Sequence, residues 1–137
     1  MANDRLECFF YGLFMDSDVL RENGVTPMAP RRAYAQDYSL RIGERAALVP
    51  SPGHRAYGMI FALAEAELQQ LYSAPGLQQY RAETIAVSTF DGELLSVRCY
   101  NVPVAPEAGE RNPQYAARLR SVLTKLGFPS EYVATVV

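Results

Sequence analysis

The sequence has few of the side chains on which metal centres and nucleophilic active sites most often depend. It contains one histidine and two cysteines in 137 residues. A catalytic triad or a cysteine nucleophile needs a basic partner, but His54 follows Gly53 in a segment that we expect to be a solvated turn. Cys8 and Cys99 each lie in an apolar, strand-like run, which predicts two buried free thiols. We therefore expect neither a metal ion nor a cofactor.

The chain also lacks an excess of charge and a long apolar run. Its formal net charge is −2, which gives no electrostatic footprint for a nucleic acid. No apolar run approaches the roughly 20 residues that a membrane helix needs, and the first seven residues, MANDRLE, are too polar and acidic for a signal peptide. The composition, 49% hydrophobic and 20% charged, is typical of a soluble globular protein. We expect a single cytoplasmic domain over residues 1–137, with no membrane partner.

The order of the expected elements predicts an α+β domain with a largely antiparallel sheet or small barrel and helices packed outside. Asp91-Gly92 between two apolar runs indicates a hairpin, and Asp16 is placed to cap a short helix. Pro50 and Pro52 are expected to end a strand, because proline cannot donate to a central ladder. We expect strands at 6–11, 32–42 with an interruption near 36–37, 46–49, 57–63, 80–89 and 94–100, and helices after 16 and at 64–71, 114–126 and 130 onward.

Several segments, in this order, resemble the gamma-glutamylcyclotransferase-like (AIG2-like) family. The resemblance starts at Phe9-Phe10-Tyr11-Gly12, which is similar to the aromatic-Tyr-Gly turn that opens the family's glutamyl-binding loop. The later segments are Leu48 to Gly53 followed by Tyr57-Gly58, then Arg98-Cys99-Tyr100, Asn112 to Tyr115 and Leu126 to Tyr132. Their shared order implies the family's fold, a small mixed and largely antiparallel β-barrel with helices outside and a pocket at one end.

The resemblance also implies a reaction and its catalytic group. Enzymes of this family release 5-oxoproline from gamma-glutamyl amines, because the substrate's own α-amine attacks its γ-carbonyl. A single glutamate transfers the proton, and backbone N–H groups after the Tyr-Gly pair hold the substrate. That glutamate stands immediately before a glycine, in the connection after the middle helix. The matching dipeptide here is Pro75-Gly76, within a stretch from Leu68 to Tyr80 that contains no acid and no base.

The binding loop departs from the family pattern as well. Where the family has a small polar residue after Tyr-Gly, this chain has Leu13, Phe14 and Met15, whose apolar side chains suit a charged amino acid less well. Backbone donors survive such a change, so Gly12 and Leu13 could still bind a carboxylate. Three tyrosines, at positions 11, 80 and 100, either line the pocket or fill the barrel. The predicted substrate-binding residues are Tyr11, Gly12, Leu13, Phe14, Met15, Pro75, Tyr80 and Tyr100.

Glu83 is the best candidate for a relocated acid. It shares strand parity with Ile85 and Val87, so it points into the barrel if those two do, and a buried carboxylate has a raised proton affinity. The alternative is that the opposite face, which includes Thr84, packs inward and Glu83 is solvated. The remaining acids are expected to cap helices or face water, and Arg81 and Arg98 either pair with a ligand carboxylate or flank strands at the surface. The acids expected to cap helices or face water are Asp16, Asp18, Glu65, Glu67, Asp91 and Glu93.

Two functions stay open, besides a different reaction in the same pocket, for which the sequence offers no assembled set of catalytic residues. In the first, the protein keeps the fold and binds a small molecule, a gamma-glutamyl compound or another amine or amide, but has lost or altered the release of 5-oxoproline. In the second, it is an active gamma-glutamyl(amine) cyclotransferase that uses Glu83. Pro75 and the apolar loop favour the first.

Overall fold

Residues 5–137 form a closed barrel, as expected, but it has five strands where six strand segments were predicted. The computed structural model describes residues 5–137, so the first four residues of the N-terminal segment discussed above lie outside the described part. The strands are β1 (Arg5–Phe10), β2 (Met28–Ile42), β3 (Ala46–Ala64), β4 (Arg81–Thr89) and β5 (Leu94–Asn101). Their order around the barrel is β1-β3-β2-β4-β5, and only the closing pair, β1 with β5, is parallel.

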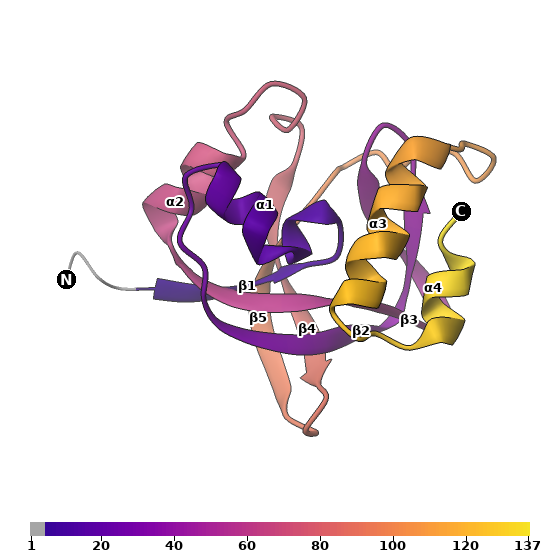
Figure 1. Cartoon of the computed structure of the whole chain (residues 1–137), viewed down its shortest axis with the longest axis horizontal. Coiled ribbons are helices and arrows are strands. Elements are labelled where there is room, and N and C mark those ends of the chain that lie inside the picture. The colour runs from indigo at the N-terminus through magenta and orange to yellow at the C-terminus, as the bar shows by residue number, and fades with distance from the viewer. Residues whose placement is uncertain (1–4) are drawn as a thin grey trace.

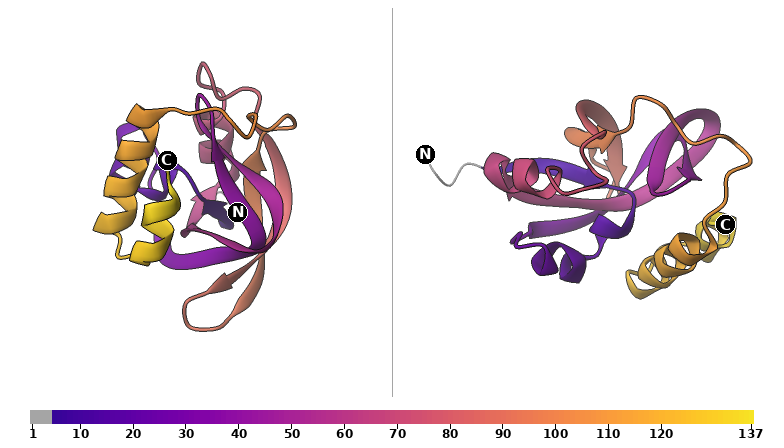
Figure 2. Two further views of the ribbon diagram at one scale, coloured as in Figure 1. Left: turned by 90° about the vertical axis from the view of Figure 1, so that its right-hand side faces the viewer. Right: turned by 90° about the horizontal axis from the view of Figure 1, so that it is seen from above.

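The helices lie outside the barrel (Figures 1 and 2). They are the short 3₁₀ helix η1 (Leu13–Met15), α1 (Ser17–Glu22), α2 (Glu65–Leu71), α3 (Pro113–Lys125) and α4 (Ser130–Thr135). The Asp16 carboxylate caps α1 by accepting a hydrogen bond from the backbone N–H of Asp18, which confirms the predicted cap. Helices α3 and α4 lie side by side on one flank, and the β4–β5 hairpin projects away from them (Figure 1).

Strand β3 continues through the two prolines that were expected to end it. Pro50 pairs with Tyr38 of β2, and pairing resumes at Arg55 opposite Gln36. Residues 51–54 therefore stand opposite Asp37 alone, in a bulge. The bulge removes the need for ladder hydrogen bonds at Pro52, so the prediction of a strand end was wrong.

Asp37 and His54 belong to this bulge. Asp37 has a φ of 68°, and its carboxylate accepts a hydrogen bond from Gly53 N–H at 2.9 Å. His54 is exposed, as predicted, but it lies within β3 rather than in a turn between two strands, and its Nδ1 is 2.9 Å from Ser51 Oγ.

The core has two layers, because β1 is buried on both faces. Phe9 and Cys99 pack inside the barrel with Ile60, whereas Cys8 and Phe10 pack between the barrel and the helices. Both cysteines are buried free thiols, as predicted, and they belong to different layers. Burial raises the pKa of both thiols.

Candidate ligand-binding site

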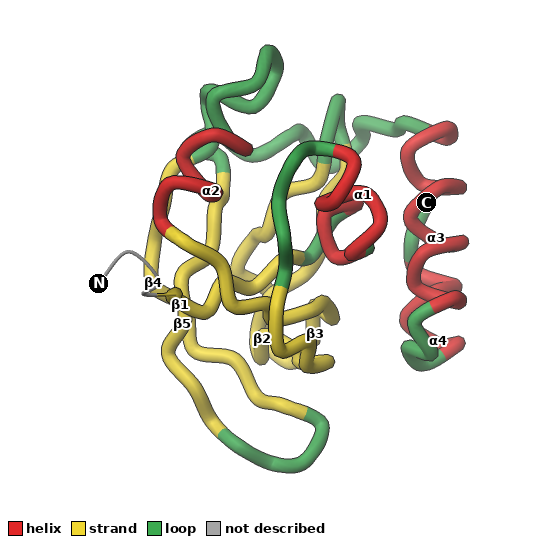
Figure 3. Tube along the Cα trace, turned by 60° about the vertical axis from the view of Figure 1, so that its left-hand side comes forward, coloured by secondary structure: helices red, strands yellow, loops and turns green. Residues whose placement is uncertain are grey.

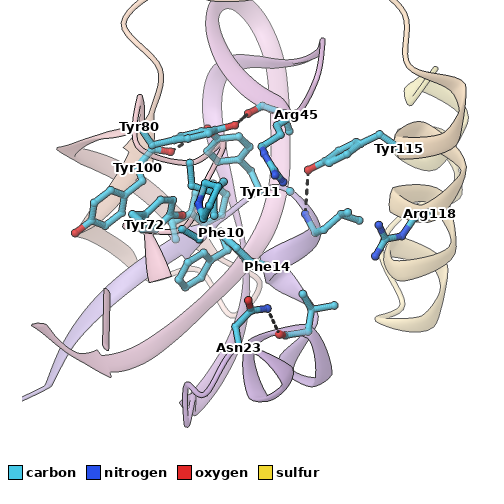
Figure 4. A pocket seen from close by; sticks show the side chains of 18 residues that line it. Phe10, Tyr11, Phe14, Asn23, Arg45, Tyr72, Tyr80, Tyr100, Tyr115 and Arg118 are labelled. Atoms are coloured by element: carbon cyan, nitrogen blue, oxygen red, sulfur yellow. Dashed lines mark hydrogen bonds between the residues drawn. The ribbon is translucent and has the colours of Figure 1, made fainter. Parts of the chain in front are cut away.

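A cavity of about 260 Å³ opens beside the end of β1. Figure 4 shows side chains converging on it from β1, η1, α1, β5, α3 and the connection after α2. Its wall consists of Phe9, Phe10, Tyr11, Gly12, Leu13, Phe14, Val19, Asn23, Arg45, Ala46, Tyr72, Ala74, Pro75, Leu77, Tyr80, Tyr100, Tyr115 and Arg118. The cavity therefore lies where segments far apart in the sequence meet.

One side of the cavity is the turn from Tyr11 into η1. The hydroxyl of Tyr115, on α3, lies so close to Gly12 that a Cβ at that position would be 2.6 Å from it. The same hydroxyl accepts a hydrogen bond from the backbone N–H of Leu13 at 3.2 Å. Glycine is needed here for space, and one backbone donor of this loop already has a partner within the protein.

The opposite side is the connection between α2 and β4, which Figure 3 shows as a loop extending beyond α2. Leu77 N–H donates to the Ala74 carbonyl at 3.0 Å, which closes a turn with Pro75 and Gly76 at its centre. Gly76 has a φ of +84°, so the arrangement is that of a type II turn, with proline second and glycine third. Pro75 is thus held on the cavity wall by local backbone geometry.

Tyrosines form most of the remaining wall. The Tyr11 hydroxyl donates to the Tyr100 carbonyl at 2.9 Å and also reaches Asn101 Oδ1 at 3.1 Å. The Tyr80 hydroxyl donates to the Ala46 carbonyl at 2.5 Å. Tyr72 stacks on Tyr100 with ring centroids 4.0 Å apart and an interplanar angle of 14°. Tyr11 and Tyr80 therefore use their hydroxyls to fix the wall to the barrel.

Within the part of the chain that the structure describes, the ionisable groups of the wall are five tyrosines and two arginines, with no aspartate or glutamate. Burial is the largest influence on each tyrosine and raises its pKa, so all five are neutral near pH 7. Arg45 lies between Tyr80 and Tyr115 in Figure 4, and Arg118 approaches from α3. No lining side chain is a base at neutral pH.

The structure brings together most of the residues that were predicted for the pocket: Tyr11, Gly12, Leu13, Phe14, Pro75, Tyr80 and Tyr100. Met15 does not reach the cavity, because it is fully buried in the layer beneath the helices. The tyrosines at 11, 80 and 100 line the cavity and also pack in the core layers, so the two alternatives for them are not exclusive.

Glu83 is exposed and is not among the residues that line the cavity. Ile85 and Val87 are buried, as the parity argument required, but β4 becomes solvent-exposed towards its start and Glu83 lies there. The alternative was right that Glu83 is solvated, but wrong that the face containing Thr84 packs inward, since Thr84 is exposed as well.

The other charged residues considered in the sequence analysis are bonded to groups outside the cavity. Arg98 forms an ion pair with Glu65 at 2.6 Å, and Arg81 is exposed and donates to the backbone. Glu67 does not simply face water, because it accepts hydrogen bonds from the backbone N–H groups of Ala64 and Thr26.

Sequence reasoning missed Arg45 and Arg118 as lining residues. Arg118 lies three residues after Tyr115 and so shares a helix face with it, but Tyr115 was not predicted to line the cavity either. Arg45 had no comparable signal, since its place depends on how the β2–β3 connection folds over Gly76. Tyr72 likewise had no signal in the sequence, and only the fold brings it to the cavity wall.

The sequence profile of one family, described as "Gamma-glutamyl cyclotransferase, AIG2-like", matches residues 8–118. The chain belongs to this family. The matched segment includes the Tyr11-Gly12 loop, the 72–80 connection and both cavity arginines. All residues that line the cavity therefore lie within the matched segment.

Solved structures agree with the AIG2-like fold. A protein named "Gamma-glutamyl cyclotransferase" superimposes with a TM-score of 0.81 at 20% identity, over 96% of this chain and 86% of the other. An uncharacterised protein from Homo sapiens gives 0.80 at 21% identity, over 98% and 87%. An AIG2-like protein from Mus musculus gives 0.58 at 17% identity, over 93% and 86%. No curated protein matches the chain at a significant level. These identities establish the fold alone.

Residues 5–137 contain neither a group of side chains suited to a metal ion nor a helix suited to a membrane span. In that range, no three histidine, cysteine, aspartate or glutamate side chains are grouped so that they could hold a metal ion. Within the same residues, no helix has the length and apolar character needed to cross a membrane.

Proposed function

We propose that this AIG2-like protein binds a small molecule in the cavity beside Tyr11-Gly12 and does not release 5-oxoproline by the family's carboxylate-assisted route. The observation that carries the proposal is that, among residues 5–137, no aspartate or glutamate lines the cavity. Pro75 occupies the place where the family resemblance puts the proton-transferring glutamate. Proline has no ionisable group, so it cannot move a proton between the attacking and the leaving nitrogen.

The neighbouring groups do not replace that carboxylate. Arginine side chains stay protonated and donate only, and the lining tyrosines have raised pKa values. One backbone donor of the loop, Leu13 N–H, is bonded to Tyr115. The pocket therefore keeps the shape of a binding site and lacks a base for the cyclisation.

The second candidate is a cyclotransferase that uses Glu83. The feature in its favour is the position of Glu83 on β4, two residues before the buried Ile85 and paired with Cys99, which precedes Tyr100 on β5. For Glu83 to act in this reaction, β4 would have to follow a different path that brings the Glu83 carboxylate to the cavity.

The experiment is an assay of 5-oxoproline release from a panel of gamma-glutamyl amino acids and gamma-glutamyl amines at high protein concentration. Wild type and Glu83→Gln are measured side by side, with a thermal-shift screen of the same compounds. We expect no release above buffer from either protein. Release by the wild type would contradict the proposal, and its loss in Glu83→Gln would support the second candidate.

A further inference from the structure

The arginines of this chain divide into two groups by their hydrogen bonds. The sequence contains twelve arginines, and ten of their side chains donate a hydrogen bond to another part of residues 5–137. The two that have no such partner in that range are Arg45 and Arg118, and both line the cavity. Among the described residues, the arginines whose guanidinium groups donate no hydrogen bond thus both lie at the cavity.

Arg45 is half-buried, and a Cβ on Gly76 would be only 3.1 Å from its Nη2. Its guanidinium lies between Tyr80 and Tyr115 (Figure 4), and no carboxylate forms an ion pair with it in the described chain. A partly desolvated guanidinium without a partner loses hydration and gains little in return. An anion in the cavity would restore its hydrogen bonds.

Arg118 is exposed, on the α3 side of the cavity, and is a turn away from Tyr115 on the same helix. Both guanidinium charges act on the Tyr115 hydroxyl: burial raises the pKa of Tyr115, and Arg45 and Arg118 are among the groups that oppose this rise. The two positive charges therefore converge on the same part of the wall.

The rest of the wall is aromatic. Phe14 meets Phe10 and Tyr72 edge to face, with centroid distances of 6.3 and 5.9 Å, and Tyr72 stacks on Tyr100. Such surfaces favour a flat apolar group. The lining residues include no carboxylate that could pair with an ammonium group.

Resting on the proposed function, we infer that the ligand is an organic carboxylate with a planar apolar body. Its carboxylate is held by Arg45 and Arg118, and its body lies against Phe14 and the stacked Tyr72 and Tyr100. Planar guanidinium groups suit a carboxylate because their N–H donors match its two oxygens.

The test is isothermal titration calorimetry with matched pairs of probes: benzoate, phenylacetate and 3-phenylpropanoate, each against its primary amide. The pairs have the same shape and differ in charge. We expect at least one carboxylate to bind at least about tenfold more tightly than its amide, because hydrogen bonds to a charged group are the stronger ones. If no carboxylate binds more tightly than its amide, the inference is overturned.

Variants assign the selectivity to the two arginines. Arg45→Gln is expected to lower the affinity for the carboxylate about tenfold and to leave the amide unchanged. The matched control is Arg21→Gln, which removes the same charge from an exposed residue that pairs with Asp18. Equal affinity of Arg45→Gln and wild type for the carboxylate would overturn the inference.

Arg118→Gln keeps the test decisive if Arg45→Gln fails to fold, because Arg118 is exposed. We expect it to lower carboxylate affinity about two- to fivefold at low salt, and this difference to shrink as salt is added. An Arg118→Gln variant that binds the carboxylate like wild type at low salt would count against the inference. Probe selectivity and 5-oxoproline release are separate readouts, so release overturns the proposed function alone, whereas loss of charge selectivity overturns this inference alone.

Discussion

The Tyr115 hydroxyl accepts a hydrogen bond from the backbone N–H of Leu13 at 3.2 Å, and so joins α3 to the loop that follows β1. These residues are 102 positions apart in the sequence. The contact fixes one wall of the cavity and occupies a backbone donor that would otherwise face it. Three predictions concern this contact and the cavity beside it, and a fourth concerns Glu67, at the start of α2.

Tyr115→Phe should free the Leu13 N–H. Because a partly buried donor loses its partner, we expect the free energy of unfolding to fall by about 1 kcal/mol and the Leu13 amide to exchange faster with solvent. Urea unfolding and amide hydrogen exchange measure these effects. The control is Tyr34→Phe, since the Tyr34 hydroxyl donates no hydrogen bond to any other described residue. Unchanged exchange at Leu13 would show that the contact does not exist in solution.

Gly12→Ala should be destabilising because its Cβ would be 2.6 Å from the Tyr115 hydroxyl and 3.3 Å from the Ala46 Cβ. We expect a loss of about 1–3 kcal/mol in urea unfolding. In a Tyr115→Phe background the oxygen is gone, and the cost should fall by about 0.5 kcal/mol or more. Gly109→Ala is the control, because an added Cβ there meets nothing within 4 Å. Additive effects of the two substitutions would contradict this account of Gly12.

Pro75→Glu should compete with an anionic ligand for Arg45. Position 75 lines the cavity next to Gly76, which is close to the Arg45 guanidinium, so a glutamate there can pair with Arg45. We expect carboxylate affinity to drop about tenfold relative to Pro75→Gln, measured by calorimetry. Both variants lose the stiffness of proline and should be less stable by a similar amount, about 0.4–1 kcal/mol. Equal carboxylate binding by the two variants would contradict the assigned role of Arg45.

Glu67 should make the stability depend on pH. Burial raises the pKa of this carboxyl, but hydrogen bonds from the Thr26 and Ala64 amides and the nearby Arg5 outweigh burial, so its folded pKa lies below the ordinary 4.5. The lowered pKa means that the contribution of Glu67 is present above its unfolded pKa and is lost as the pH falls through its folded pKa.

Urea unfolding of Glu67→Gln at pH 7 and pH 2 tests this contribution. The variant should be about 1 kcal/mol less stable than wild type at pH 7, and the difference should shrink at pH 2. Glu22→Gln serves as the control, because Glu22 is exposed and accepts no side-chain hydrogen bond from the described residues. A difference of the same size at both pH values would rule out Glu67 as its source.

Features that depend on a few neighbouring residues could be predicted from the sequence. Asp16 caps α1, and Asp91-Gly92 turns the β4–β5 hairpin, because capping and tight turns are decided within three or four residues. Pro75-Gly76 also forms a turn whose type depends only on these two residues and their immediate neighbours.

Features that depend on contacts between distant segments were missed or wrong. Strand β3 passes its prolines because Asp37, on another strand, provides the opposing side of the bulge. The position of Arg45 depends on the 72–80 connection that lies over it, and the exposure of Glu83 depends on where β4 leaves the barrel. The alternation of side chains along a strand predicts neither the position of Arg45 nor the exposure of Glu83.

The central claim is that this cavity binds a ligand without cyclising gamma-glutamyl compounds. Its most direct test is a single-turnover measurement, with protein in excess over an isotope-labelled gamma-glutamyl amine and 5-oxoproline detected by mass spectrometry. Excess protein makes even one slow turnover visible. The account predicts that labelled 5-oxoproline stays at the level of the buffer blank, and a rise in proportion to the protein concentration would contradict it.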